Sequence, residues 1–332
     1  LLKKLLKLFK KLGNLINKFL RALLFRKSPF NILMRSPKFD ALLSRYSTII
    51  IFLIPALTVF TLFVVLPIGE AAYYSFFRWN GYGAPEKYVG FKNYAYLFKN
   101  RVFIMSLKNN FYIIAISLFV QLPFALLIAL MISDKLKGAT FFRTVFFLPY
   151  ILAEIVTALI WAYIYDGNYG LVAAVWGFFG AEAPFILGDK DWALVAILIV
   201  IFWKFFGIHM MIYIAGLQAI SKEVLEAAKV DGAGPITTAF RIKIPMLIPT
   251  IKLSVFLSLL GSLQLFDIIM PLTGGGPSNV THSMVSYLYY FGVMRMKVGF
   301  GSAVGVVIFL ICLVIAIGYQ RTLMRDDNEN KF

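Results

Sequence analysis

The sequence predicts an all-α integral membrane protein with six membrane-spanning helices. Of its 332 residues, 60% are hydrophobic and only 15% are charged, and the mean hydropathy is +0.81. A helix needs about 20 apolar residues to cross the hydrocarbon core of a bilayer. Because lipid offers the backbone no hydrogen-bonding partner, such segments are expected to be helices. Six segments qualify, at residues 48–68, 111–133, 145–165, 192–214, 250–270 and 301–319.

Basic residues gather in front of the first of these segments and indicate its orientation. Residues 3–45 hold twelve lysines and arginines but only one acid, Asp40. Basic residues beside the first span predict a cytoplasmic N-terminal side, and six spans return the tail at 323–332 to that side. The net charge of +17 is therefore attributed to the membrane surface and not to nucleic acid. The basic connection at 70–108 would lie outside, against this rule, although long loops cross membranes regardless of charge.

The first 46 residues are predicted to form a basic amphipathic helix followed by a linker. Apolar residues recur at helical spacing, at Leu5, Leu8, Leu12, Leu15, Phe19 and Leu23. The lysines and arginines fall largely elsewhere, as in helices that lie in the plane of an anionic membrane surface. Such a helix acts either as a passive anchor or as a regulatory element that touches a partner. The predicted organisation is a cytoplasmic segment at 1–46, a six-helix domain at 47–322 and a cytoplasmic tail at 323–332.

A polar, sharply punctuated stretch at 221–249 interrupts the apolar pattern. Ser221 is a candidate N-cap, and the acidic residues that follow it favour the N-terminal end of a helix through residue 230. Asp231-Gly232-Ala233-Gly234-Pro235 must end that helix, since glycine frees the backbone and proline removes a donor. A second helix would then complete a helix–turn–helix elbow on the cytoplasmic membrane surface. Several small side chains favour a docking element over an ordinary connecting loop, namely Ala227, Ala228, Gly232 and Ala233.

The order of residues in this elbow resembles the EAA signature of binding-protein-dependent ABC importer permeases. The matching positions are Glu226, Ala227, Ala228, Asp231, Gly232, Ala233, Phe240, Ile242, Pro245 and Pro249. The signature is most similar to that of the carbohydrate-uptake branch, the maltose-type and multiple-sugar permeases, and the resemblance extends over about residues 54–310. It implies that the elbow is a coupling helix seated in a groove of a cytoplasmic ATPase subunit. The contact residues would be Glu226, Ala227, Ala228, Asp231, Gly232 and Ala233.

The segment 88–94 also resembles the connection that follows the first conserved span of that family. The resemblance implies that such an outer loop forms a lid or touches an extracytoplasmic binding protein. An aromatic belt at the membrane interface explains the aromatic residues of this connection as well.

Seven residues inside two of the predicted spans are candidates for the lining of a substrate cavity. They are Trp203, Lys204, Gly207 and Met210 in the fourth span and Ser262, Gln264 and Asp267 in the fifth. Trp203, Gly207 and Met210 share one helix face, where a ring beside a glycine suits a sugar, although helix packing explains the pattern too. An ammonium is costly in mid-span, so Lys204 should face protein or a watery cavity. Gln264 suits sugar hydroxyls, Asp267 suits them or pairs with Lys204, and Ser262 lines the cavity or bonds to its own helix.

The chain shows no sign of a catalytic or metal site of its own. It lacks a Walker motif, metal-ligand spacing, and any nucleophile–base arrangement built from its two histidines and single cysteine. We therefore expect no catalytic residues, no metal site, no cofactor and no ATPase activity on this chain.

The resemblance implies a function and a set of partners. The chain would be the permease subunit of an ABC importer in the bacterial cytoplasmic membrane, moving a carbohydrate, expected to be an oligosaccharide, into the cytoplasm. Its partners would be a second homologous permease, two cytoplasmic ATPase subunits that carry ATP and Mg²⁺, and an extracytoplasmic sugar-binding protein. Glycerol phosphate importers share the same scaffold. Because Lys204 is a cation, an acidic saccharide is a further candidate substrate.

Two other classes of function are open from the residues alone. A secondary transporter driven by an ion gradient would need intramembrane relays, for which Asp267, Lys204 and Glu154 are the candidates. A membrane-embedded enzyme would need paired catalytic groups, which the sequence lacks.

Overall fold

The computed structural model describes residues 49, 53–85, 87–133 and 138–324 of the chain. Within that part the regular structure is helical, apart from one isolated antiparallel bridge between Phe77 and Tyr88. The chain divides into two compact units, Leu1–Glu70 and Ala71–Phe332. The predicted amphipathic helix at 1–46 and most of the tail at 323–332 lie outside the described residues. The predicted all-α class is confirmed for the rest.

The first apolar helix corresponds to the predicted span at 48–68. It covers the 22 residues Leu53–Tyr74 and contains the π-helical turn η2 (Thr61–Val65) and α3 (Leu66–Tyr74). Its side chains are all exposed from residue 53 to residue 70. A helix that is apolar all round is suited to a lipid environment and not to water.

The second apolar helix is longer than the predicted 111–133. After α4 (Lys92–Lys99), the chain continues as α5 (Arg101–Ile116), the π-helical turn η3 (Ser117–Gln121) and α6 (Leu122–Ser133). Together these form a rod of 32 residues, Arg101–Ile132. Asn100 caps the rod, because its side-chain oxygen accepts from the backbone N–H groups of Val102 at 3.0 Å and Phe103 at 3.3 Å.

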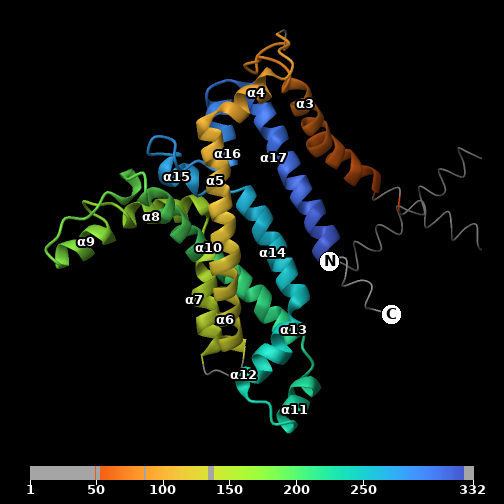
Figure 1. The fold of residues 1–332 in the computed structure, drawn as a ribbon, viewed down its shortest axis with the longest axis vertical. Coiled ribbons are helices and arrows are strands. Elements are labelled where there is room, and N and C mark those ends of the chain that lie inside the picture. Colours follow the sequence, from red (N-terminus) through yellow and green to blue (C-terminus); the bar gives the residue numbers. More distant parts are fainter. Residues whose placement is uncertain (1–48, 50–52, 86, 134–137, 325–332) are drawn as a thin grey trace, which may run out of the picture. The chain divides into compact units, whose positions relative to one another are not determined.

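The third predicted span, 145–165, is not one straight helix. α7 (Ala139–Ile151) and α8 (Glu154–Ile164) meet at 97°, with the extended residues Leu152 and Ala153 between them. Pro149 lies in the last turn of α7, where its missing N–H weakens the helix. As a result, α8 and the following α9 (Leu171–Phe178) turn sideways out of the bundle (Figure 1).

The central helix of the second unit is α10 (Trp192–Gln218), which matches the predicted span at 192–214. After the short η4 (Ile186–Gly188), its 27 residues pack mainly against α6 and α7 and also touch α5, α8 and α14. Its N-terminal half joins an apolar cluster with α8 and α15, and its C-terminal half joins another with α6. The helix therefore fixes the positions of the elements around it.

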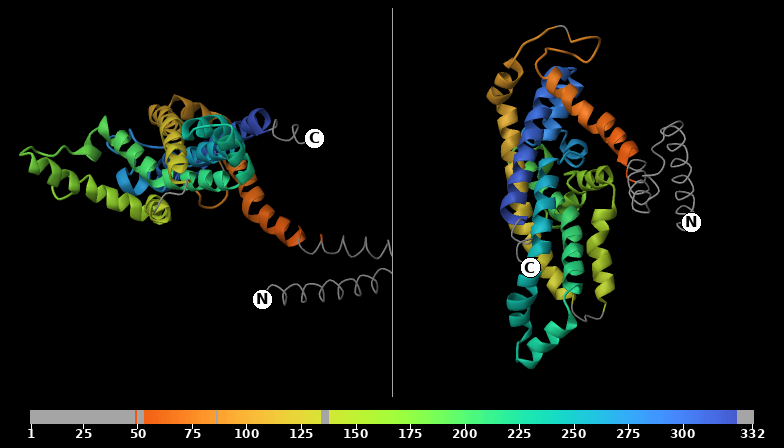
Figure 2. Two further views of the ribbon diagram at one scale, coloured as in Figure 1. Left: turned by 90° about the horizontal axis from the view of Figure 1, so that it is seen from below. Right: turned by 90° about the vertical axis from the view of Figure 1, so that its right-hand side faces the viewer.

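The polar stretch at 221–249 forms the predicted elbow. Ser221 caps α11 (Lys222–Val230) by accepting from the N–H of Val224 at 3.4 Å. A turn leads into α12 (Pro235–Thr238), which continues through η5 (Ala239–Lys243) and α13 (Ile244–Met246) and meets α14 (Ile248–Leu263) at 65°. Figures 1 and 2 show the elbow at one end of the second unit, and Figure 1 shows α4 at the opposite end.

The fifth predicted span, 250–270, ends earlier than expected. α14 stops at Leu263, and the chain continues through a loop, α15 (Ile269–Thr273), a second loop, α16 (Met284–Tyr287) and η6 (Leu288–Met294). The last apolar helix is α17 (Val298–Tyr319) with η7 (Gln320–Met324), which contains the predicted span at 301–319. The described residues hold four helices long and apolar enough to cross a membrane, or six if each bent pair counts as one span.

His282 anchors the loop between α15 and α16. Its side chain is fully buried, with Nδ1 3.0 Å from Ser286 Oγ and Nε2 3.4 Å from Asn279 Oδ1. Burial, with a smaller contribution from the charge of Arg295, lowers the pKa of His282 to about 4. The imidazole is therefore held neutral in the folded protein at neutral pH.

We expect the folded protein to lose stability as the pH falls from about 6.5 to about 4. The ordinary histidine pKa is 6.5, so in this window the unfolded chain binds a proton at His282 that the folded chain does not. The stabilisation is complete above this window and is lost as the pH decreases through it. Thermal unfolding of the purified protein in detergent measures the effect, and His282→Gln should flatten it. An identical pH profile in the variant would contradict the assignment.

Candidate functional site

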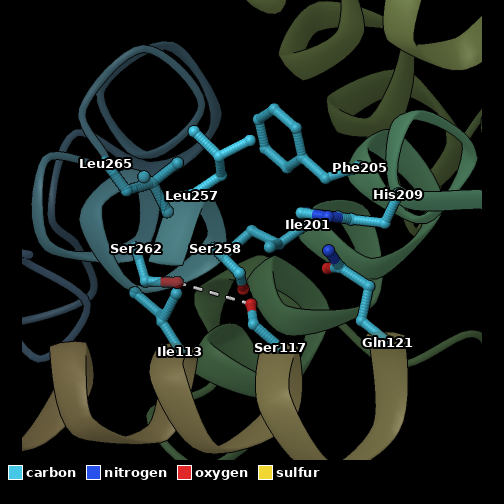
Figure 3. Close-up of a pocket in the computed structure, with 11 residues that line it drawn as sticks. Ile113, Ser117, Gln121, Ile201, Phe205, His209, Leu257, Ser258, Ser262 and Leu265 are labelled. Atoms are coloured by element: carbon cyan, nitrogen blue, oxygen red, sulfur yellow. Dashed lines mark hydrogen bonds between the residues drawn. The ribbon is translucent and has the colours of Figure 1, made fainter. Parts of the chain in front are cut away.

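A small cavity lies inside the bundle, between η3, α10 and α14. Its volume is about 90 Å³, and its polar side chains are Ser117, Gln121, His209, Ser258 and Ser262 (Figure 3). Ser262 Oγ donates to Ser117 Oγ at 3.4 Å. Sites for drug-sized ligands occupy about 300–1,000 Å³. In this conformation the cavity is therefore too small for a saccharide.

One amide in the cavity has an unused acceptor. Gln121 is 1% exposed, and its Oε1 has no hydrogen-bond partner among the described residues. The neighbouring His209 is engaged elsewhere, with Nδ1 2.6 Å from Ser254 Oγ. A buried acceptor without a partner costs about 1–3 kcal/mol. The cavity therefore favours a small hydrogen-bond donor such as water.

Two of the predicted cavity residues belong to helix packing. A Cβ added at Gly207 would collide with the carbonyl oxygen of Phe146 and lie 3.1 Å from the Cα of Phe147, so glycine allows α10 to cross α7 closely. Met210 is fully buried in the apolar cluster with α6. Neither residue lines this small cavity. Their shared helical spacing is explained here by a contact between spans, and their role in a substrate path stays a prediction.

Lys204 stabilises the broken end of α7. It is 1% exposed, and its Nζ donates to the carbonyl oxygens of Pro149 at 3.1 Å, Tyr150 at 3.3 Å and Leu152. These carbonyls lie at the end of a helix, where the backbone leaves acceptors unpaired. An ammonium has three donors, so one side chain serves all three. Lys204 thus faces protein, one of its two expected placements, and not the cavity.

Three further predicted cavity residues lie near the surface of the chain, whereas Ser262 is buried and lines the small cavity. Trp203 is half-buried and meets Trp161 edge to face at 5.5 Å. Gln264 and Asp267 are exposed, because α14 has ended before them. Asp267 and the Glu154 carboxyl at the start of α8 are close enough to interact electrostatically, and Glu154 is in turn within electrostatic reach of Lys204. The breaks after α7 and after α14 therefore bring together two residues, Glu154 and Asp267, that lie more than 110 positions apart in the sequence.

Two asparagines that the sequence analysis missed hold this region in place. Asn110 Nδ2 donates to the Ser262 carbonyl at 2.7 Å, and its Oδ1 accepts from the Met284 N–H at 2.8 Å. Asn109 Nδ2 donates to the carbonyls of Val280 at 2.7 Å and His282 at 2.9 Å. Adjacent amides inside an apolar helix were the available signal, since buried polar groups in a span require partners.

Replacing Asn110 with leucine should destabilise the protein by several kcal/mol. The change leaves the Ser262 carbonyl and the Met284 N–H buried without their partner, at about 1–3 kcal/mol for each group. Phe111→Leu is the matched control, because Phe111 is the next residue along and is 66% exposed. Thermal unfolding in detergent compares the two variants. Equal midpoints would show that the Asn110 bonds do not hold the end of α14.

The elbow presents small and apolar side chains at its surface. Among the predicted coupling residues, exposed positions are Glu226, Ala227, Asp231 and Gly232, whereas Ala233 is half-buried and Ala228 is buried. Three large apolar side chains beside them are strongly exposed: Val230 at 88%, Ile236 at 76% and Phe240 at 67%. An exposed apolar group of this kind is typical of a protein contact.

Gly232 gives the turn of the elbow its shape. Its φ is +78°, the left-handed region that glycine adopts without a steric penalty. Its N–H donates to the Lys229 carbonyl at 3.1 Å, and the Ala233 N–H donates to the Ala228 carbonyl at 2.9 Å. This pair of bonds is a Schellman motif, which ends α11. The order Asp231-Gly232-Ala233 therefore has a local structural cause.

Residues 121–325 match the family described as binding-protein-dependent transport system inner membrane component. The chain is 35% identical over 271 residues to the probable ABC transporter permease protein YurN of Bacillus subtilis (strain 168), a match that covers 80% of this chain and 92% of that protein. It is 30% identical over 285 residues to the diacetylchitobiose uptake system permease protein NgcF of Streptomyces coelicolor, with 82% and 81% covered.

A solved structure shares the fold. It is a bacterial ABC transporter involved in the import of the acidic polysaccharide alginate, and it matches with a TM-score of 0.77 at 22% identity, over 87% of this chain and 99% of that chain. The helical architecture and the apolar spans agree with the sequence matches. The chain is a multi-pass membrane protein that belongs to the binding-protein-dependent ABC importer permeases, in their carbohydrate-uptake branch.

Proposed function

We propose that this chain moves a carbohydrate, an oligosaccharide, into the bacterial cytoplasm, driven by ATP hydrolysis on separate subunits. The observation that carries the proposal is the elbow, a capped helix and a defined turn with exposed apolar side chains at one end of the bundle. An ATPase subunit that seats α11 would move it when the subunits close on ATP. The short helices α12 and α13 continue into α14, so they would transmit that movement to the spans.

The substrate would pass along a face of this chain and not through its interior. The internal cavity of about 90 Å³ is too small for a sugar, whereas Gln264 and Asp267 are exposed and Glu154 lies beside Asp267. Polar groups exposed at membrane depth are expensive unless they face a partner or water. A second homologous permease that faces this group would enclose a wider path between the two chains. Trp203 and Ser262 would support the path, and Lys204, Gly207 and Met210 would fix its wall.

The remaining partners follow from the same arrangement. Two cytoplasmic ATPase subunits would carry ATP and Mg²⁺, with no cofactor on this chain, and an extracytoplasmic sugar-binding protein would deliver substrate to the side opposite the elbow. Both termini would then lie in the cytoplasm. An ion-driven transporter is the less supported alternative, because Lys204, one of its candidate relay groups, is held by three backbone carbonyls.

Reconstituted vesicles test the proposal. Vesicles that contain this chain, its partner permease, the ATPase subunits and the binding protein should accumulate a labelled oligosaccharide only with Mg-ATP. Omitting the ATPase subunits should abolish uptake. Uptake that persists without them and follows an imposed proton or sodium gradient would refute the proposal.

A further inference from the structure

A basic groove lies at the end of the second unit opposite the elbow, where Figure 1 shows α4. It is formed by the loop that follows α3, the helix α4, the turn between η6 and α17, and the start of α17, and its volume is about 1070 Å³. That is several times the volume of the cavity inside the bundle, about 90 Å³. The groove is large enough for several sugar units, since the pockets that take drug-sized ligands occupy about 300–1,000 Å³.

The walls of the groove are held by hydrogen bonds to backbone carbonyls. The N–H of Arg78 donates to the Lys87 carbonyl at 2.8 Å, which folds the loop back on itself. Asn93 Nδ2 donates to the carbonyls of Ser75 at 2.7 Å and Phe77 at 3.0 Å, which ties the loop to α4. The Gly299 N–H donates to the Trp79 carbonyl at 3.0 Å, which ties the loop to α17. The groove is therefore formed before any ligand binds.

The charges that line the groove are all of one sign among the described residues. Its cations are Arg78, Lys87, Lys92, Arg295 and Lys297, and no described lining residue is acidic. None of the five forms an ion pair with a carboxylate of the described part of the chain; Glu86, next to Lys87, lies outside that part. Arg295 is held over the rings of Phe291 at 4.4 Å and Tyr290 at 5.0 Å. A cleft lined by one sign of charge concentrates ligands of the opposite sign.

Aromatic rings and an amide share the groove with these cations. Tyr82 is 74% exposed and Tyr96 is 59% exposed, and the ring of Tyr96 is held edge to face against Phe300 at 5.4 Å. Exposed rings offer flat apolar surfaces with a polar tip, which suits the C–H faces of a pyranose. Asn80 adds donors and an acceptor for hydroxyl groups. Arginine and lysine form their strongest hydrogen bonds with anionic groups, carboxylates and phosphates.

We infer that this groove captures a carboxylate-bearing oligosaccharide, a uronate-type chain, before it enters the translocation path. The inference rests on the proposed function and narrows its substrate class to acidic saccharides. The cations hold the carboxylates, the tyrosine rings pack on the sugar faces, and Asn80 bonds to hydroxyls. Because the contacts are ionic and exposed, their strength decreases as salt screens them.

Binding to the full chain in nanodiscs of zwitterionic lipid tests the inference. The probes are tetragalacturonate and maltotetraose, which have the same number of sugar units but differ in charge. We expect tetragalacturonate to bind at least tenfold more tightly, and its affinity to fall at least tenfold between 50 and 500 mM NaCl. The double variant Lys87→Gln/Lys297→Gln should weaken binding at least tenfold. The matched control is Lys222→Gln/Lys229→Gln, which removes two exposed cations at the elbow and should bind as the wild type does.

Three results would overturn the inference. They are equal binding of the two saccharides, unchanged binding in the groove variant, and equal loss in the control variant. If instead phosphatidylglycerol co-purifies with the wild type and is lost from the groove variant while tetragalacturonate does not bind, the groove is a lipid site. ATP-dependent uptake of a neutral oligosaccharide that is unaffected by the groove variant would leave the proposed function standing without the inference. Absence of ATP-dependent uptake for every saccharide would refute the proposed function itself.

Discussion

Replacing Gly232 with valine should reduce ATP-driven uptake at least tenfold while the protein still inserts into the membrane. Gly232 holds φ at +78°, and a β-branched residue there is a steric outlier. Even an ordinary L-residue pays about 1–2 kcal/mol in the left-handed region, and about 1.4 kcal/mol is a tenfold change in an equilibrium. Nothing lies within 4 Å of an added Cβ, so the change acts on the backbone turn and not through a collision. The measurements are uptake and substrate-stimulated ATPase activity in reconstituted vesicles.

Gly180→Val is the control for this experiment. Gly180 has φ of +70° and likewise nothing within 4 Å of an added Cβ, but it follows α9 and not α11. The local strain is therefore matched, and only the location differs. We expect near-normal uptake in the control. Equal losses in the two variants would show that general destabilisation, and not the shape of the elbow, explains the effect.

Replacing Gly207 with alanine should destabilise the folded protein by about 3 kcal/mol, at the upper end of the usual cost of overpacking. The added Cβ would meet the Phe146 carbonyl and the Phe147 Cα, which are backbone atoms and cannot rotate away. α7 and α10 would have to separate. Lys204 is one turn away on α10 and bonds to the end of α7, so the separation would also pull at its three hydrogen bonds.

Gly261→Ala serves as the comparison for Gly207→Ala. Gly261 lies within α14 and has nothing within 4 Å of an added Cβ, so the same substitution should leave stability unchanged or slightly raised. Fluorescence-detected size-exclusion after heating ranks the two variants against the wild type. If Gly207→Ala and Gly261→Ala unfold at the same temperature, the close crossing of α7 and α10 does not limit stability.

Local chemistry made some elements predictable. The elbow depends on Ser221 as a cap and on Gly232 as a left-handed residue, and both effects act within a few positions. The first, fourth and sixth spans depend on the length of an apolar run, which composition alone reveals.

The helix breaks and the cavity residues depend on partners that are distant in sequence. Nothing in Leu152 and Ala153 themselves demands a bend of 97°, and the bend is stabilised by Lys204, which lies 52 positions after Leu152. α14 ends at Leu263 where Asn110, 152 positions away, supplies a donor to the Ser262 carbonyl. The helical spacing of Gly207 and Met210 is the same for residues that face a cavity and for residues that face a neighbouring helix. Only tertiary contacts distinguish these alternatives.

The π-helical turn η3 separates the rod Arg101–Ile132 into two halves that are out of phase. A π turn contains one residue more than an α turn, and one residue corresponds to about 100° of rotation in a helix of 3.6 residues per turn. Residues that would continue a lipid-facing row of α5 at regular helical spacing are therefore rotated toward the protein-facing side in α6. Ser117 and Gln121, the first and last residues of η3, both line the cavity. A deletion of one residue within η3 would restore a regular helix and rotate the far half of the rod away from α10.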